Sequence, residues 1–67
     1  PAPGLAAWEA GVARYRAGRF GEAERDFAEA ARLDPADPLP AIFRERCAEL
    51  RAAPPADWDG VFTMRSK

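Results

Sequence analysis

The sequence has no histidine, one cysteine and one methionine among its 67 residues. Without histidine, the chain lacks the commonest general base and the commonest metal ligand among protein side chains. Cys47 alone makes neither an internal disulfide nor a cysteine metal site, and it has no histidine to activate it as a nucleophile. We therefore expect a chain that is not an enzyme, holds no cofactor and no metal, and resides in a reducing, cytoplasmic compartment.

The sequence also lacks a charge excess and a long apolar run. Ten Lys and Arg against eleven Asp and Glu leave a net charge of -1, so nothing attracts a phosphate backbone over long range. No apolar run approaches the roughly 20 residues that cross a bilayer, and the first residues do not resemble a secretion signal. We expect neither nucleic acid nor membrane as a partner. A start at Pro1 rather than methionine suggests a fragment of a longer protein.

Hydrophobic residues make up 48% of the chain and charged residues 31%, a balance typical of a folded domain. Proline and glycine break the chain at Gly18, at residues 34–38 and at Pro54 and Pro55. The predicted helices between these breaks span residues 5–17, 20–33 and 38–52. Gly18 suits a left-handed helix cap, and Asp37 suits an N-cap followed by Pro38 at the first helical position.

Apolar residues recur in each predicted helix at steps of three and four, which places them on one face. In the second helix, Ala23 and Ala30 lie beside Phe27, so that a neighbouring helix can approach closely. Short connections predict sequential antiparallel neighbours. The predicted core consists of Trp8, Phe20, Phe27, Ile42, Phe43 and Leu50. Cys47 is expected to pack in this core or at its boundary.

The second helix carries a family resemblance. Ala23, Phe27, Ala30 and Pro35 follow the small–aromatic–small–proline spacing of the tetratricopeptide (TPR) repeat, and Gly18 and Phe20 match its turn. Leu5 and Trp8 recur as Leu39 and Ile42 at a period of about 34 residues. The first helix matches less well, because Gly11-Val12 stands for Leu-Gly and the turn is one residue shorter. The resemblance covers residues 5–50 and implies an all-α, protein-binding fold: a helix hairpin plus a third helix over residues 1–53, then an ordered tail over 54–67. An unrelated three-helix bundle is the alternative.

The tail carries a second resemblance. Arg46-Cys47, then Pro54-Pro55-Ala56-Asp57-Trp58-Asp59-Gly60-Val61-Phe62 and the final Lys67, is similar to the extreme C-terminus of certain bacterial class III adenylate or guanylate cyclases. There, a TPR-like segment follows the catalytic domain. The resemblance implies a regulatory or assembly element in signal transduction, with the catalytic residues outside this chain. A purely structural capping fragment of a helical-repeat protein is the alternative.

Two groups of residues are candidates for contact with a partner. Arg14, Arg16 and Arg19 form a basic cluster that is either a solvated face or a grip for an acidic peptide or terminal carboxylate. The large apolar side chains of the tail, among them Trp58 and Phe62, either fold back over the helices or dock on another chain. The predicted partner is a second copy or a parent cyclase domain. The predicted contact residues are Arg14, Arg19, Ile42, Phe43, Trp58 and Phe62.

Asp57 and Asp59 flank Trp58, which is compatible with part of a calcium loop. The remaining acids of such a loop, including its closing glutamate, are missing. A turn is the simpler interpretation, in which Asp57 caps the chain and Gly60 adopts a positive φ.

Overall fold

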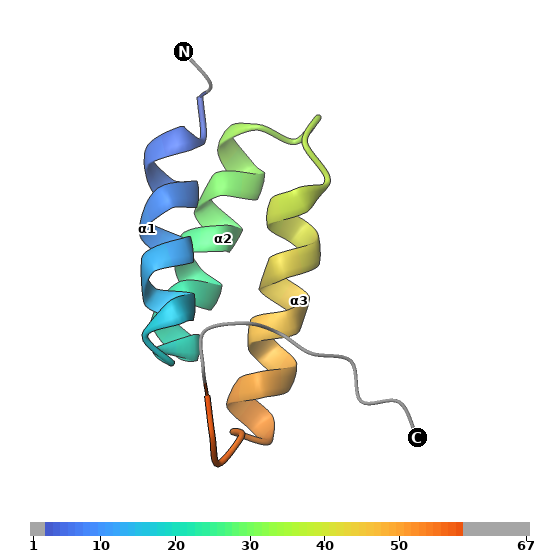
Figure 1. The fold of residues 1–67 in the computed structure, drawn as a ribbon. Helices are drawn as coiled ribbons and strands as arrows, with labels where there is room; N and C mark the ends of the chain where they lie inside the picture. Colours follow the sequence, from blue (N-terminus) through green and yellow to red (C-terminus); the bar gives the residue numbers. More distant parts are fainter. Residues whose placement is uncertain (1–2, 59–67) are drawn as a thin grey trace.

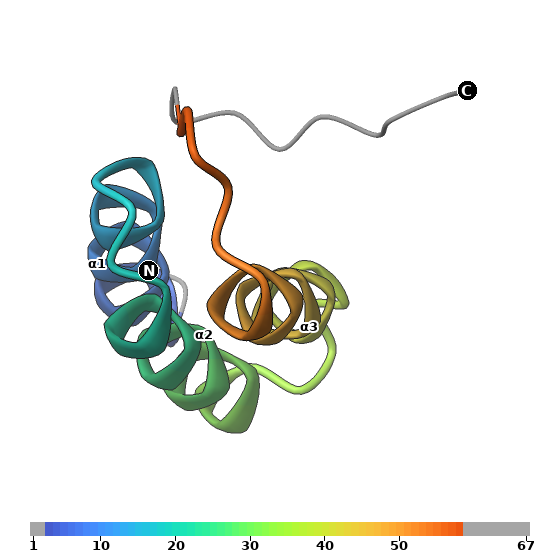
Figure 2. The same ribbon diagram turned by 90° about the horizontal axis from the view of Figure 1, so that it is seen from below.

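The computed structural model describes residues 3–58, and these form three helices (Figure 1). The helices are α1 (Leu5–Arg16), α2 (Phe20–Leu33) and α3 (Leu39–Ala52). Consecutive helices run antiparallel, and α2 packs against both of its neighbours. Seen from below, the three helices form a curved row with α2 in the middle (Figure 2). We term the concave side of this row, which α1 and α3 border, the hollow side. The predicted all-α fold is confirmed for the described residues.

The helix ends lie within one residue of the predicted ones. Gly18 adopts φ 81°, the left-handed value predicted for it, and its N–H donates to the carbonyl of Tyr15 at 3.1 Å. At α3 the helix begins at Leu39 rather than at Pro38, which takes the N-cap position. The Asp37 carboxylate still caps this end, because it accepts a hydrogen bond from the Leu39 N–H at 3.1 Å. A one-residue difference of this kind is normal at frayed helix ends.

An aromatic core lies between the helices, with Phe27 at its centre. The buried apolar side chains of the described residues are Tyr15, Phe20, Ala23, Phe27, Ala30, Pro40 and Cys47. The Phe27 ring is inaccessible to solvent and lies 5.2 Å from the Trp8 ring and 5.5 Å from the Phe43 ring, centroid to centroid. Trp8, Phe43 and Leu50 are partly buried against this core. Trp8 of α1 and Phe43 of α3 therefore pack on the same residue of α2, Phe27, which links the three helices.

Gly11 permits the close approach of α1 to α2. It is buried, and a Cβ at this position would lie 2.7 Å from Cε1 of Phe27. Real Cβ atoms essentially never come that close to another heavy atom. The pair of Gly11 and Phe27 therefore sets the spacing of the first two helices.

The prediction that Ile42 belongs to the core is wrong, since 44% of Ile42 is exposed. Neighbouring residues of a helix point about 100° apart. Phe43 faces the aromatic core, so Ile42 cannot also do so. Leu39, on the same stripe as Ile42, is 47% exposed. The third helix consequently buries only part of its predicted apolar stripe.

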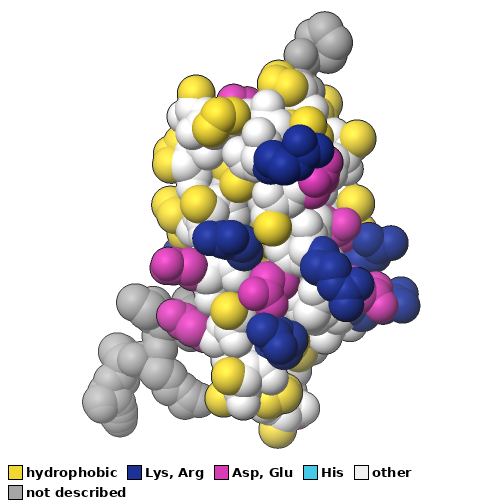
Figure 3. All heavy atoms as spheres, turned by 180° about the vertical axis from the view of Figure 1, so that it is seen from behind, with side chains coloured by type: hydrophobic (Ala, Val, Ile, Leu, Met, Phe, Trp, Pro, Cys, Tyr) yellow, Lys and Arg dark blue, Asp and Glu magenta, His cyan; other side chains and the backbone are white. Residues whose placement is uncertain are grey.

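The convex side of the molecule carries charged side chains of both signs (Figure 3). Glu24 on α2 accepts a hydrogen bond from Arg51 on α3 at 2.9 Å, and Glu29 pairs with Arg32 within α2. Exposed pairs of this kind contribute at most about 1 kcal/mol each to stability. This side therefore presents paired charges to solvent, with apolar side chains among them (Figure 3).

Candidate functional site

The hollow side between α1 and α3 presents an apolar surface, which we term the open face. The open face consists of Leu5, Trp8 and Val12 on α1 and Leu39, Ile42 and Phe43 on α3. The Trp8 and Phe43 rings meet across it edge to face, with centroids 5.2 Å apart. Leu5 and Leu39 are each 47% exposed, so the rim at the start of both helices is the most accessible part.

Helical spacing and one cation–π contact indicate which residues of α3 belong to the open face. Leu39, Ile42 and Arg46 recur at three- and four-residue steps and so share one stripe of the helix. The Arg46 guanidinium carbon lies 5.0 Å from the centroid of the Phe43 ring, which shows that this stripe borders the ring. On α1, Leu5, Trp8 and Val12 follow the same spacing. The open face is therefore a mixed aliphatic and aromatic surface with Arg46 on one edge.

Trp58 closes the opposite end of the hollow side. After α3 the chain passes Pro54 and Pro55 and returns toward the end of α1 (Figure 1). The indole N–H donates to the carbonyl of Tyr15 at 2.8 Å and to that of Arg16 at 3.1 Å. These carbonyls belong to the last turn of α1, where the helix dipole concentrates negative charge. The half-buried Trp58 therefore folds back over the helices of its own chain, which is one of the two alternatives expected for it.

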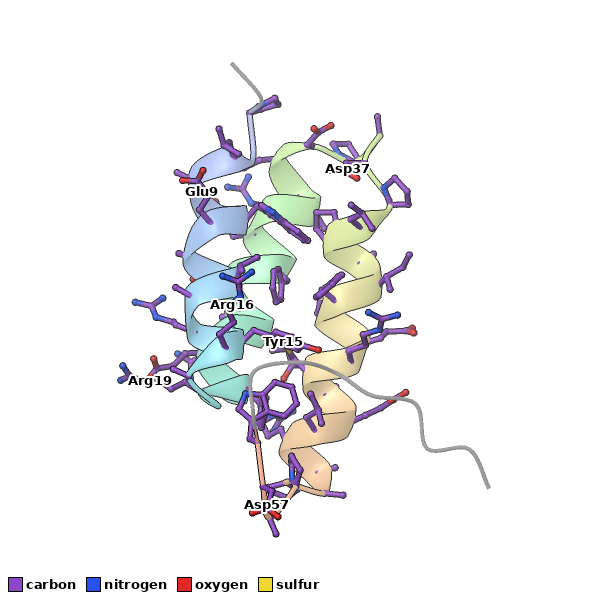
Figure 4. The ribbon with its side chains drawn as sticks, in the orientation of Figure 1. Glu9, Tyr15, Arg16, Arg19, Asp37 and Asp57 are labelled. Atoms are coloured by element: carbon purple, nitrogen blue, oxygen red, sulfur yellow. The ribbon has the colours of Figure 1, made fainter. Side chains whose placement is uncertain are left out.

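Two aromatic rings and one glycine shape the site that receives Trp58. The Trp58 ring lies edge to face with the Tyr15 ring at 5.2 Å and with the Phe20 ring at 4.9 Å. Figure 4 shows Tyr15 reaching from α1 toward α3 beside this site. A Cβ on Gly18 would lie 3.3 Å from Cδ1 of Trp58, so the absence of a side chain there makes room for the indole. We term the site formed by Tyr15, Gly18, Phe20 and the two α1 carbonyls the indole pocket.

The Tyr15 hydroxyl is buried and has no hydrogen-bond partner in the described part of the chain. Burial raises the pKa of Tyr15, and the positive charge of Arg46 acts in the opposite direction. A buried polar atom without a partner costs about 1–3 kcal/mol. The hydroxyl therefore contributes nothing favourable to the fold, while the ring to which it is attached contacts Phe20, Phe27, Phe43 and Trp58.

Two of the three residues of the predicted basic cluster, Arg14 and Arg19, are paired with acids of the same chain. Arg14 donates to Asp26 at 2.7 Å, and both Arg14 and Arg19 form ion pairs with Glu22 at 3.4 and 3.1 Å. The hydrogen bond to Asp26 raises the pKa of Arg14. These residues line a shallow depression together with Arg25, and Figure 4 shows Arg19 pointing away from α3. Arg14 and Arg19 are thus not brought together with the open face, and their contact with a partner stays a prediction.

Of the other predicted contact residues, the structure brings Ile42 and Phe43 together on the open face. Trp58 lies at the other end of the same side, linked to Phe43 through the Tyr15 ring. Phe62 falls outside the described residues, as do Asp59 and Gly60 of the predicted turn. Tyr15 and Gly18 were not predicted to form part of a pocket, since their spacing indicates only a helix face and a helix cap.

Cys47 is completely buried, and burial raises the pKa of its thiol to about 11. At neutral pH the thiol is protonated and shielded, which opposes any reaction as a nucleophile. Across residues 3–58, no group of three or more Cys, Asp or Glu side chains is arranged to hold a metal ion. In the same stretch, none of the three helices has the length and hydropathy that spanning a membrane requires.

Comparison with known proteins finds no match among family models, curated proteins or solved structures. The two sequence resemblances accordingly stay hypotheses.

Proposed function

We propose that this chain is a non-catalytic protein-interaction and assembly module that binds a partner through its open face. The observation that carries the proposal is the exposure of Leu5, Leu39 and Ile42, at 44–47% each, beside the half-buried rings of Trp8 and Phe43. Each square ångström of apolar surface removed from water contributes about 25 cal/mol. Exposed apolar patches mark interaction sites on protein surfaces.

The proposed partner is a second copy of the chain. A two-fold axis presents the same apolar patch twice, so a single exposed surface is sufficient for a closed dimer. Helical-repeat units also need neighbours, because one unit cannot bury its faces alone. Leu39 and Ile42, two of the five apolar residues on the predicted stripe of α3, are exposed, which supports a missing neighbour on this helix. The other three are Phe43, Cys47 and Leu50.

We further propose that the module is the C-terminal regulatory segment of a bacterial nucleotide cyclase, as its TPR-like helices and its Pro-Pro-x-Asp-Trp-Asp-Gly-Val tail suggest. By resemblance, the active sites of class III cyclases form between two catalytic domains. A segment that pairs with its own copy beside these domains would hold them together or set their geometry.

A structural cap is the second candidate function, and Trp58 favours it. By packing on Tyr15 and Phe20, this residue closes one end of the aromatic core within its own chain. A fragment that completes its own core needs no further partner at that end. The two candidates differ in what the open face does in solution.

Sedimentation of the intact chain from micromolar to millimolar concentration tests the proposal. We expect a mass that rises toward a dimer with concentration. Ile42→Glu should place a charge on the open face and hold the chain monomeric. The control is Ala41→Glu, which adds the same charge at the adjacent exposed position, about 100° around the helix. This variant should associate like the unmodified chain. If the unmodified chain stays monomeric over the whole concentration range, the structural cap is favoured instead.

A further inference from the structure

The indole pocket matches one kind of side chain in three independent ways. Its two carbonyl oxygens, on Tyr15 and Arg16, converge on a single N–H donor at 2.8 and 3.1 Å. The rings of Tyr15 and Phe20 present themselves to the same indole at near right angles, with interplanar angles of 85° and 83°. Gly18 supplies the space that any other L-residue would fill at 3.3 Å from the indole. A large flat ring with one N–H on its edge meets all three conditions.

Trp58 is the sole anchor of the tail in the part that the structure describes. Between α3 and Trp58, residues 54–57 form no hydrogen bond, and all but the half-buried Pro55 are exposed. Within residues 54–58, the contacts of Trp58 in the pocket are therefore the ones that hold the tail to α1 and α2. Because no helix has to unwind, occupation of the pocket is open to exchange.

We propose that the indole pocket is a binding site for a tryptophan side chain, which Trp58 fills within its own chain and which Trp58 of a second copy fills when the tail is exchanged. This proposal deepens the proposed function and rests on it for the identity of the partner. The tail of a second copy is the occupant because it carries the same tryptophan after the same two prolines. The Tyr15 ring, 5.5 Å from the Phe43 ring, connects the pocket to the open face on which that copy would be seated.

The N–H is the basis of selectivity. A phenylalanine side chain would retain contact with Tyr15 and Phe20 but would leave both carbonyls without the donor. Loss of one net hydrogen bond corresponds to about a tenfold loss of affinity. An apolar pocket without a specific role for the carbonyls would accept both side chains almost equally.

The test uses the intact chain with Trp58→Ala, labelled with ¹⁵N, and the unlabelled peptide of residues 53–67 as the probe. We expect a saturable shift of the Gly18 amide resonance, and about tenfold weaker binding for the same peptide with Trp58→Phe. Trp58→Phe in the chain itself is the second receptor, because it keeps a ring on the core if the alanine variant does not fold. The peptide should displace that phenylalanine and produce the same shift.

Exchange between copies is then tested with whole chains. The labelled Trp58→Ala chain is mixed with an unlabelled donor that carries Gly18→Ala, which keeps Trp58 but crowds its own pocket. The Gly18 amide of the receptor should shift as it does with the peptide, and a donor with Gly18→Ala and Trp58→Phe should produce a much smaller shift. Association through the open face alone would shift the Leu39 and Ile42 amides and leave Gly18 unchanged, so its outcome is separate.

Three results would overturn the proposal. The first is a folded receptor that shows no saturable Gly18 shift up to millimolar peptide. The second is equal binding of the tryptophan and phenylalanine peptides, which would show that the carbonyls select nothing. The third is a receptor that binds the peptide but not the donor chain. This result would show that Trp58 of a whole chain fills only the pocket of its own chain.

Discussion

Replacement of Gly11 by alanine tests the packing of α1 on α2 most directly. The added methyl group would lie 2.7 and 2.8 Å from two carbon atoms of the Phe27 ring, and 3.0 Å from a third. Ordinary contacts of a Cβ begin near 3.4 Å, so the ring or the helix must shift by more than half an ångström. The Phe27 ring is completely buried and is enclosed by Trp8, Tyr15 and Phe43, which restricts any movement away from the added methyl group.

The magnitude follows from two opposing effects. Overpacking of a filled core costs about 1–3 kcal/mol, and we expect the upper end because three rings block relaxation. Alanine in place of glycine within a helix returns about 1 kcal/mol. The net destabilisation is therefore about 2 kcal/mol, which lowers the Tm of a domain of this size by about 8–16 °C. Thermal and urea unfolding followed by circular dichroism measure both quantities.

Gly21→Ala is the matched control for this variant. Gly21 is also helical, but a Cβ there would lie 3.4 Å from Cδ of Arg51, an ordinary contact with a largely exposed side chain. Without a clash, only the helix preference remains, and we expect a change between zero and about 1 kcal/mol of stabilisation. The two glycine-to-alanine changes should thus have opposite signs. If the Gly11→Ala chain has a Tm equal to or above that of the unmodified chain, the enclosed packing of Phe27 is refuted.

Two further predictions concern buried polar atoms. Tyr15→Phe removes a hydroxyl that has no partner in the described structure and should leave stability unchanged or raise it by up to about 1 kcal/mol in urea unfolding; a loss above that range would reveal a partner. Because the folded state raises the pKa of Cys47 from 9.0 to about 11, it retains a proton that the unfolded state releases. Its contribution to stability is complete below about pH 9 and is lost as the pH rises toward 11. Alkylation by iodoacetamide at pH 8 should likewise be far slower for the folded chain than in urea, and equal rates would contradict the burial.

The second helix shows how much of this fold follows from the sequence. Phe20, Ala23, Phe27 and Ala30 lie at three- and four-residue steps, and all four are buried on one face. Gly18 and Pro35 mark the two breaks that bound it. Because such signals are local, the boundaries of α2 agree with the predicted range of 20–33 to the residue.

Contacts that depend on the relative placement of helices were not predictable in this way. Ile42 and Phe43 are equally apolar neighbours, and only the position of α1 and α2 decides which of them is buried. The contact of Gly11 with Phe27 is invisible to a pattern in which glycine contributes no hydrophobicity. Trp58 and its acceptor on Tyr15 are 43 residues apart, so their hydrogen bond follows from the path of the tail, which no helical period describes.

The two ends of the hollow side differ for a physical reason. At the end where α1 finishes, Trp58 reaches both carbonyl oxygens and rings, so the chain satisfies that end by itself. Leu5 and Leu39 begin their helices at the other end, beyond the reach of the Trp58 contacts, and remain half exposed. The third helix packs mainly on α2 and meets α1 through the rings of Trp8, Tyr15 and Phe43, while Leu39 and Ile42 stay exposed beside them. A partner therefore gains most at the start of α1 and α3, where apolar surface is still in water. Exchange of Trp58 would add little burial but would make the association specific for a chain that carries the same tail.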